Sequence, residues 1–142
     1  MLKNRVVIIS LMLCVVLGTI PFAMGATPTS SNKVSISALY VGAPHQTVNQ
    51  EYIKITNKGT TAVRMKGWKI TDKGAIHTYK FPSTFVLKSK TTATLFTGKG
   101  TNTATKLYWG RAAFVWNNAG DKASLYNAQN KLVSTKIGLK QK

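Results

Sequence analysis

Beyond residue 33, short segments in which apolar and polar residues alternate recur along the chain. In "VSISALY" at 34–40 and "EYIKITN" at 51–57, alternate side chains fall on one face of an extended backbone, which is typical of a half-buried β-strand. No window repeats its apolar residues about every 3.6 positions, as an amphipathic helix does. The pattern predicts strands at 34–40, 51–57, 62–65, 68–72, 77–81, 91–97, 106–109, 114–116, 122–126 and 132–137.

Glycine close to asparagine or aspartate marks several connections between these strands. The turns "NKG" at 57–59, "DKG" at 72–74 and "NAGD" at 118–121 each offer a glycine that can take positive φ, beside a residue that tolerates a tight turn. Many short strands with regular turns favour an all-β sandwich over an α/β enzyme fold.

The first 25 residues have the layout of a secretory signal peptide. A basic start is followed by an apolar block over residues 6–20 and by the small residues Ala23 and Gly25, which suit a cleavage site. The block is too short to span a bilayer comfortably, since a spanning helix needs about 20 apolar residues. Cys14, the one cysteine of the chain, lies in this block and would leave with the peptide.

Cleavage after Gly25 would leave a polar leader at 26–32 and one folded domain at 33–142. We expect the protein to be secreted or associated with the cell surface, with no transmembrane span in the mature chain. Retention of the peptide as an N-terminal anchor is the alternative.

The chain is strongly basic. It has 20 Lys and Arg residues against 3 Asp and Glu residues, which gives a formal net charge of +17. A charge of this sign and size attracts polyanions, such as nucleic acid or an anionic polymer of the cell envelope. Lysine greatly outnumbers arginine and neutralises phosphate without reading bases, so binding to nucleic acid would be non-specific. The expected contacts are Lys54, Lys69 and Lys73, with Arg64, Lys66 and Arg111 in support.

Few side chains able to catalyse a reaction follow residue 25. The three acids, Glu51, Asp72 and Asp121, fall at strand ends or turns, where carboxylates commonly accept hydrogen bonds from backbone N–H groups. His45 and His77 are far apart in the sequence and form no recognisable metal set. We therefore expect no enzyme, no metal site, no cofactor and no small-molecule substrate.

The aromatic run "LYWGRAAFVWNN" at 107–118 has two interpretations. Tyr108, Trp109 and Trp116 flank Arg111, and bases or sugars stack on such rings. A sandwich of this size, however, needs large inward residues, so we favour the core for these rings and an exposed position for Arg111.

The stretch "KGWKITDKG" at 66–74 combines a buried face and a basic face. Alternation puts Trp68 and Ile70 on one side of the strand and Lys69 and Lys73 on the other. The predicted core residues are therefore Trp68, Ile70 and Trp116. Whether the outward lysines join those of neighbouring strands in one patch is left open.

Four segments in order resemble the lamin tail domain family: "NQEYIKITNKGTTAVRMKGWKITDKG", "YKFPSTFVLKSKTTATLFTGKG", "YWG" and "VWNNAGDKASLYNAQNKLVSTKIG". The shared features are an acid–aromatic strand ending in Asn, a Gly-Trp strand ending in Asp, a Phe-Pro turn and a Trp-Asn-Gly-Asp turn. The resemblance implies an immunoglobulin-like β-sandwich that serves as a binding or tethering module. In bacteria and archaea such domains occur in exported or surface proteins, often beside nucleases or other hydrolases.

Three hypotheses follow for the function. The first is an exported binding module that attaches to extracellular polyanion, either DNA or an anionic envelope polymer. The second is a structural domain that binds a protein partner or an envelope protein, in which charge only sets solubility and location. The third is an accessory domain that captures substrate for a separate hydrolase or nuclease.

Overall fold

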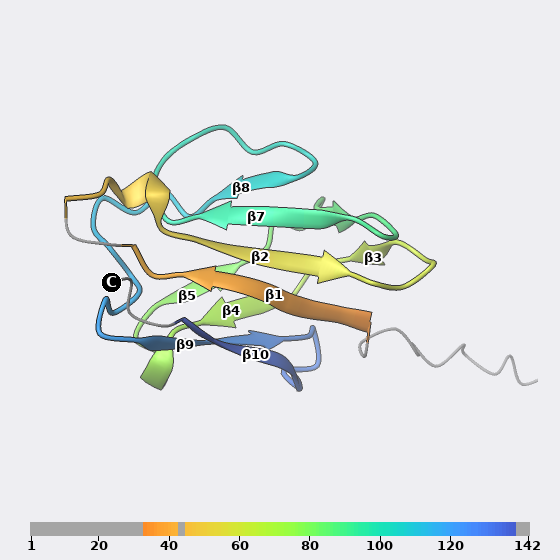
Figure 1. Ribbon diagram of the computed structural model, residues 1–142. Coiled ribbons are helices and arrows are strands. Elements are labelled where there is room, and N and C mark those ends of the chain that lie inside the picture. The colour runs from red at the N-terminus through yellow and green to blue at the C-terminus, as the bar shows by residue number, and fades with distance from the viewer. Residues whose placement is uncertain (1–32, 43–44, 139–142) are drawn as a thin grey trace, which may run out of the picture.

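The computed structural model describes residues 33–42 and 45–138, which form a β-sandwich (Figure 1). The expected signal peptide and leader lie outside the described residues. The first sheet contains, in spatial order, β1 (Val34–Tyr40), β2 (Tyr52–Asn57), β7 (Thr92–Phe96) and β8 (Lys106–Tyr108). The second sheet contains β10 (Leu132–Gly138), β9 (Asp121–Tyr126), β4 (Lys69–Thr71) and β5 (Thr78–Lys80).

Four smaller elements complete the described chain. The short strands β3 (Val63–Arg64) and β6 (Val86–Leu87) pair with each other, and two single-turn 3₁₀ helices, η2 (Val48–Gln50) and η3 (Lys73–Ala75), lie in connections. Neighbouring strands run antiparallel, except that β7 and β8 are parallel. Across the residues that the structure describes, no helix is long and apolar enough to span a membrane.

The two sheets approach each other along one edge, where β1 and β10 lie side by side (Figure 1). The amide of Ile36 in β1 donates a hydrogen bond to the Ser134 hydroxyl of β10, with an N to Oγ distance of 3.1 Å. Gly138, at the end of β10, permits this approach, because a Cβ atom there would lie 2.5 Å from Val41 Cγ1. The absent side chain therefore lets the last strand close over the first.

The core lies between the two sheets and follows the alternation of the sequence. Every second residue of β2 is buried, and Ile53 and Ile55 have no exposed surface. Tyr79 of β5 packs edge to face on both Phe81 and Trp109, and burial raises the pKa of its hydroxyl to about 12. The predicted all-β sandwich is confirmed.

One predicted strand is wrong. Residues 114–116 form a loop, because the backbone N–H groups of Val115 and Trp116 donate to the Glu51 carboxylate and not to a neighbouring strand. The strand β6 was not predicted, because its two residues are too short to show a period; it is held by pairing with β3.

The predicted glycine turns adopt two different geometries. Gly74 and Gly120 have positive φ, at 81° and 120°, as expected. Gly59 is not among the glycines with positive φ. Its amide donates to the Asn57 side chain at 2.9 Å, and an added Cβ would lie 3.0 Å from Asn57 Oδ1. Residue 59 is glycine because the Asn57 side chain lies so close to it, and not because the backbone there is left-handed.

Candidate polyanion-binding surface

Glu51 is completely buried although it is a carboxylate. Its Oε2 accepts a hydrogen bond from the Val115 amide at 2.9 Å, and its Oε1 accepts one from the Trp116 amide at 3.0 Å. Burial raises the pKa of the Glu51 carboxyl above its usual value, and the two amides oppose that shift. Glu51 therefore fixes the 114–116 loop against the start of β2 and is not available to a ligand.

Asp121 is also occupied by backbone donors. Its Oδ1 accepts from the amides of Lys73 at 3.2 Å and Lys122 at 2.7 Å, while its Oδ2 accepts from the Asn117 amide at 3.0 Å. The carboxylate joins η3, the 114–120 loop and β9, and only 8% of the residue is exposed.

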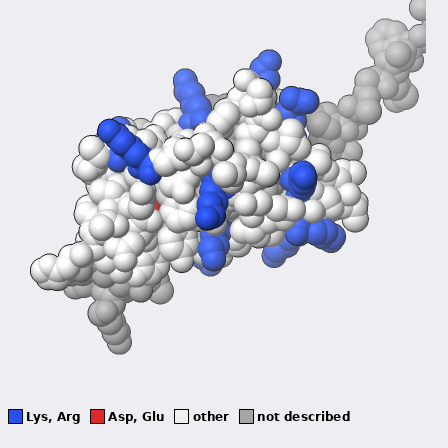
Figure 2. Space-filling model, turned by 90° about the horizontal axis from the view of Figure 1, so that it is seen from above, with Lys and Arg blue, Asp and Glu red and all other residues white. Residues whose placement is uncertain are grey.

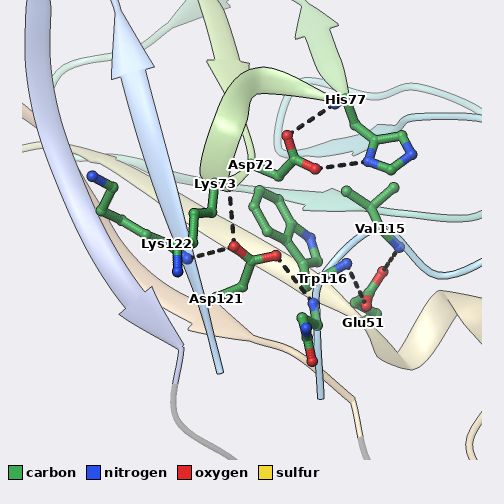
Figure 3. Close-up of polar contacts among 9 residues, drawn as sticks. Glu51, Asp72, Lys73, His77, Val115, Trp116, Asp121 and Lys122 are labelled. Carbon is green, nitrogen blue, oxygen red and sulfur yellow. Dashed lines mark hydrogen bonds and ion pairs between the residues drawn. The ribbon is translucent and has the colours of Figure 1, made fainter. Parts of the chain in front are cut away.

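Asp72 closes the same end of the sandwich. Its Oδ1 accepts from the His77 amide at 2.9 Å, and its Oδ2 lies 2.7 Å from His77 Nδ1. Figure 3 shows Asp72, Asp121 and Glu51 arranged around the Trp116 indole, each turned toward donors of the protein itself. The three acids thus serve the fold, and in the described chain no three His, Cys, Asp or Glu side chains group as a metal site requires.

The basic side chains are left without acidic partners. Within 33–42 and 45–138, every lysine and arginine is exposed except Lys69, which is half-buried. In the same ranges the one ion pair is that between His77 and Asp72. The surface is therefore positive with little compensation, and in Figure 2 lysine and arginine side chains stand at separate places over the face shown, with almost no acidic surface between them.

The predicted lysine contacts do not converge on one patch. Lys54 projects from the outer face of the first sheet, since its neighbours Ile53 and Ile55 point into the core. Lys69 projects from the second sheet, between the buried Trp68 and Ile70. Since the two sheets of a sandwich lie back to back, Lys54 and Lys69 face opposite directions.

The remaining predicted contacts lie on other parts of the surface. Lys73 is exposed in η3, Arg64 in β3, Lys66 in the turn before β4, and Arg111 in the loop after β8. The structure therefore places each of these side chains in solvent but gathers them into no single site.

A row of four aromatic rings crosses the outer face of the first sheet. Strand register brings together Tyr40, Tyr52, Phe96 and Tyr108, one from each strand. The ring centroids of Tyr40 and Tyr52 are 5.3 Å apart, those of Tyr52 and Phe96 are 6.1 Å apart, and those of Phe96 and Tyr108 are 5.2 Å apart. All four side chains are half-buried, so part of each ring faces solvent.

Lysines lie in the adjacent row of the same face. The register Lys54, Thr94, Lys106 runs across β2, β7 and β8, next to the aromatic row. The Lys54 ammonium lies over the Tyr52 ring, 5.5 Å from its centroid. Charge and partly exposed rings are thus combined on one sheet face, an arrangement suited to an anionic polymer that also carries rings.

The aromatic residues singled out in the sequence divide between core and surface. Trp68, Ile70 and Trp116 are buried, Trp109 packs partly buried against the core, and Tyr108 joins the outer row. Sequence reasoning missed Tyr40, Tyr52 and Phe96. Tyr52 and Phe96 carried a signal, since each lies on the outward side of a strand whose alternate residues are buried. Tyr40 did not, because it has the same parity as the buried Val34 and Ile36, and only the β-bulge between Ile36 and Ala38 turns it outward.

Comparison with known proteins assigns the fold to a family. The family described as Lamin Tail Domain matches residues 27–139, which is most of the chain. A search among curated proteins found no match.

Proposed function

The chain belongs to the lamin tail domain family of immunoglobulin-like interaction modules, and we propose that this member attaches to extracellular polyanions through its lysines. The extracellular location rests on the signal-peptide pattern of residues 1–25. The polyanion is DNA or an anionic polymer of the cell envelope.

The proposal rests on the burial of the three acidic side chains. Glu51, Asp72 and Asp121 are buried and hydrogen-bonded inside the protein, while the lysines stay exposed. Acidic side chains on the surface would weaken the positive field of the lysines, but the three acids of this chain are buried. The positive field is therefore available to a ligand.

The outer face of the first sheet is the binding surface that the geometry favours. Lys54 and Lys106 supply charge one row away from the rings of Tyr52, Phe96 and Tyr108. Phosphates would contact the ammonium groups, and exposed base edges or sugars would contact the rings. Among the described residues, the four strands of this sheet contain no arginine to read a base pair, which agrees with non-specific binding.

The test is a titration of fluorescently labelled duplex DNA with the full chain, followed by anisotropy at two salt concentrations. If roughly five lysines contact phosphates, affinity falls by about 500-fold between 50 and 200 mM salt, because each contact releases counterions. A polyglutamate of similar length reports whether phosphate itself is required.

Two variants of equal charge locate the surface. The double change K54Q/K106Q removes two lysines from the first sheet, and K69Q/K80Q removes two from the second. We expect the first pair to lower the salt slope by about 1.8, since each lost phosphate contact lowers it by about 0.9, and the second pair to change it little. Equal effects would contradict the assignment to the first sheet, and absence of binding to both polymers at 50 mM salt would reject the proposal.

A further inference from the structure

Exposed apolar side chains gather at one end of the sandwich, around η3 and the start of β9. Ile76 is 79% exposed just after η3, Phe114 is 41% exposed in the connection between β8 and β9, and Ile137 is 62% exposed in β10. A single exposed side chain of this kind is ordinary, but a group that lines a common depression marks an interaction site.

These side chains line two adjoining hollows. The larger has a volume of about 420 Å³, and its wall includes Ile76, Phe114 and Trp116. The smaller has a volume of about 290 Å³ and is lined by Ile137, with Lys122 beside it. Lys73, Gly120 and Asp121 border both, so the two hollows form one continuous surface.

The charge available at this surface is positive. Asp121 lies between the hollows, but its oxygens already accept the amides of Lys73, Lys122 and Asn117. Asp72, in the larger hollow, is likewise occupied by His77. The ammonium groups of Lys73 and Lys122 are exposed and unpaired in the described chain, so an incoming ligand meets cations beside the apolar side chains of the two hollows.

We propose that these two hollows bind an acidic peptide segment of another protein that carries apolar anchor residues. One apolar side chain enters the larger hollow between Ile76 and Phe114, and a second contacts Ile137 in the smaller. Carboxylates of the peptide pair with Lys73 and Lys122, which border the hollows.

The shape and chemistry of the site favour a peptide over the other partners of a basic surface. A nucleic acid backbone has charge but no aliphatic side chain, so it would leave Ile76, Phe114 and Ile137 without partners. A flat lipid surface would leave both hollows unfilled, whereas an extended peptide can place one side chain in each. The site shares no residue with the lysine and aromatic rows on the first sheet.

The experiment selects random 12-residue peptides displayed on phage against the full chain and measures the enriched peptides, as labelled synthetic compounds, by fluorescence anisotropy. We expect enriched sequences to combine Asp or Glu with Leu, Ile or Phe. The variant I76S/F114S should lower their affinity by about tenfold or more, the loss expected for truncated anchor residues. The control L132S removes another exposed apolar residue, 51% exposed, outside both hollows and should change affinity by less than about twofold.

Two further double variants test whether the positive charge of Lys73 and Lys122 contributes to peptide binding. K73Q/K122Q should weaken binding of the acidic peptides, while K88Q/K131Q, with the same loss of charge elsewhere, should not. Duplex DNA binding should be unchanged in I76S/F114S, so failure of peptide binding would leave the proposed polyanion function intact.

Three results would overturn the inference. They are no enrichment of acidic and apolar peptides, enriched peptides that bind I76S/F114S as tightly as the unaltered chain, and binding to phosphatidylglycerol vesicles that depends on Ile76 and Phe114 in the absence of peptide binding. The last result would identify the occupant as a lipid surface.

Discussion

Glu51 shows how one buried side chain determines a loop. It accepts hydrogen bonds from two consecutive amides, those of Val115 and Trp116, and thereby holds the Trp116 indole in the core. Replacement by glutamine keeps the shape but turns one acceptor into a donor. A buried amide N–H would then lose its partner.

We predict that Glu51→Gln lowers the free energy of unfolding by about 2 kcal/mol at pH 7, the cost of an unpaired buried donor. Chemical denaturation of both proteins followed by tryptophan fluorescence measures the difference. A change of less than about 0.5 kcal/mol would show that the loop is held by packing alone and not by the carboxylate.

The difference in the free energy of unfolding between the wild-type protein and Glu51→Gln depends on pH in a defined direction. The pKa of Glu51 is raised in the folded protein from its ordinary value of 4.5, so near that pH the folded state binds more protons than the unfolded state. Stability from Glu51 is therefore fully present below pH 4.5 and falls as pH rises through the folded pKa. The difference between wild type and Glu51→Gln should thus grow on acidification from pH 7 toward pH 4. A shrinking difference would mean that the two amides outweigh burial.

Strand pairing places like charges opposite each other in the second sheet. Lys69 of β4 pairs directly with Lys80 of β5, and both side chains point outward. The Lys69 ammonium lies over the Tyr126 ring of β9, 5.3 Å from its centroid and on the side away from β5. Like charges directly opposite in a sheet are unfavourable, and the position of Lys69 relieves part of that repulsion.

We predict that Lys80→Glu stabilises the domain by about 0.5 kcal/mol at low salt, since it replaces a repulsive cross-strand pair by an attractive one. Urea denaturation at 20 mM and 1 M NaCl measures the gain, which should largely disappear at high salt. Lys88→Glu makes the same charge change away from this strand pair and serves as the control. An equal gain in both variants would attribute the effect to net charge and not to the pair.

The strands could be predicted from the sequence where the signal is local. The alternation of "VSISALY" places β1 at the same bounds in the sequence and in the structure. Residues 114–116 show the limit: their apolar, aromatic composition is typical of a strand, but the partner of their amides is Glu51, about 65 positions earlier in the chain. No local pattern contains that contact.

The candidate sites show the same contrast between local sequence signals and long-range contacts. Alternation correctly indicates that Lys54 and Lys69 point away from the core, but their placement on opposite sheets depends on strand order. The aromatic row depends on register across four strands, with Tyr40 and Phe96 far apart in sequence. Parity can thus be read from a regular strand such as β2, but the bulge in β1 reverses it for Tyr40, and convergence requires the whole topology.

The whole molecule carries its charge in an asymmetric way, with acids inside and bases outside. Most of the net charge of +17 belongs to the described residues, so it is concentrated on a compact surface in the folded state and spread over a larger volume in the unfolded chain. Self-repulsion of this kind destabilises the compact state. Salt reduces it, because the Debye length shortens from about 30 Å at 10 mM to about 10 Å at 100 mM.

We predict that the thermal unfolding midpoint of the full chain rises as NaCl increases from 10 to 200 mM in the absence of any ligand. The variant K54Q/K69Q/K80Q/K106Q removes four charges from both sheet faces and should show a shallower rise, because less repulsion remains to be screened. Differential scanning fluorimetry at fixed pH measures both proteins. A midpoint that stays constant or falls with salt would mean that favourable interactions of the lysines, such as those of Lys54 with Tyr52 and Lys69 with Tyr126, outweigh their mutual repulsion. Lysines that stabilise the fold in this way would be less available to bind a polyanion.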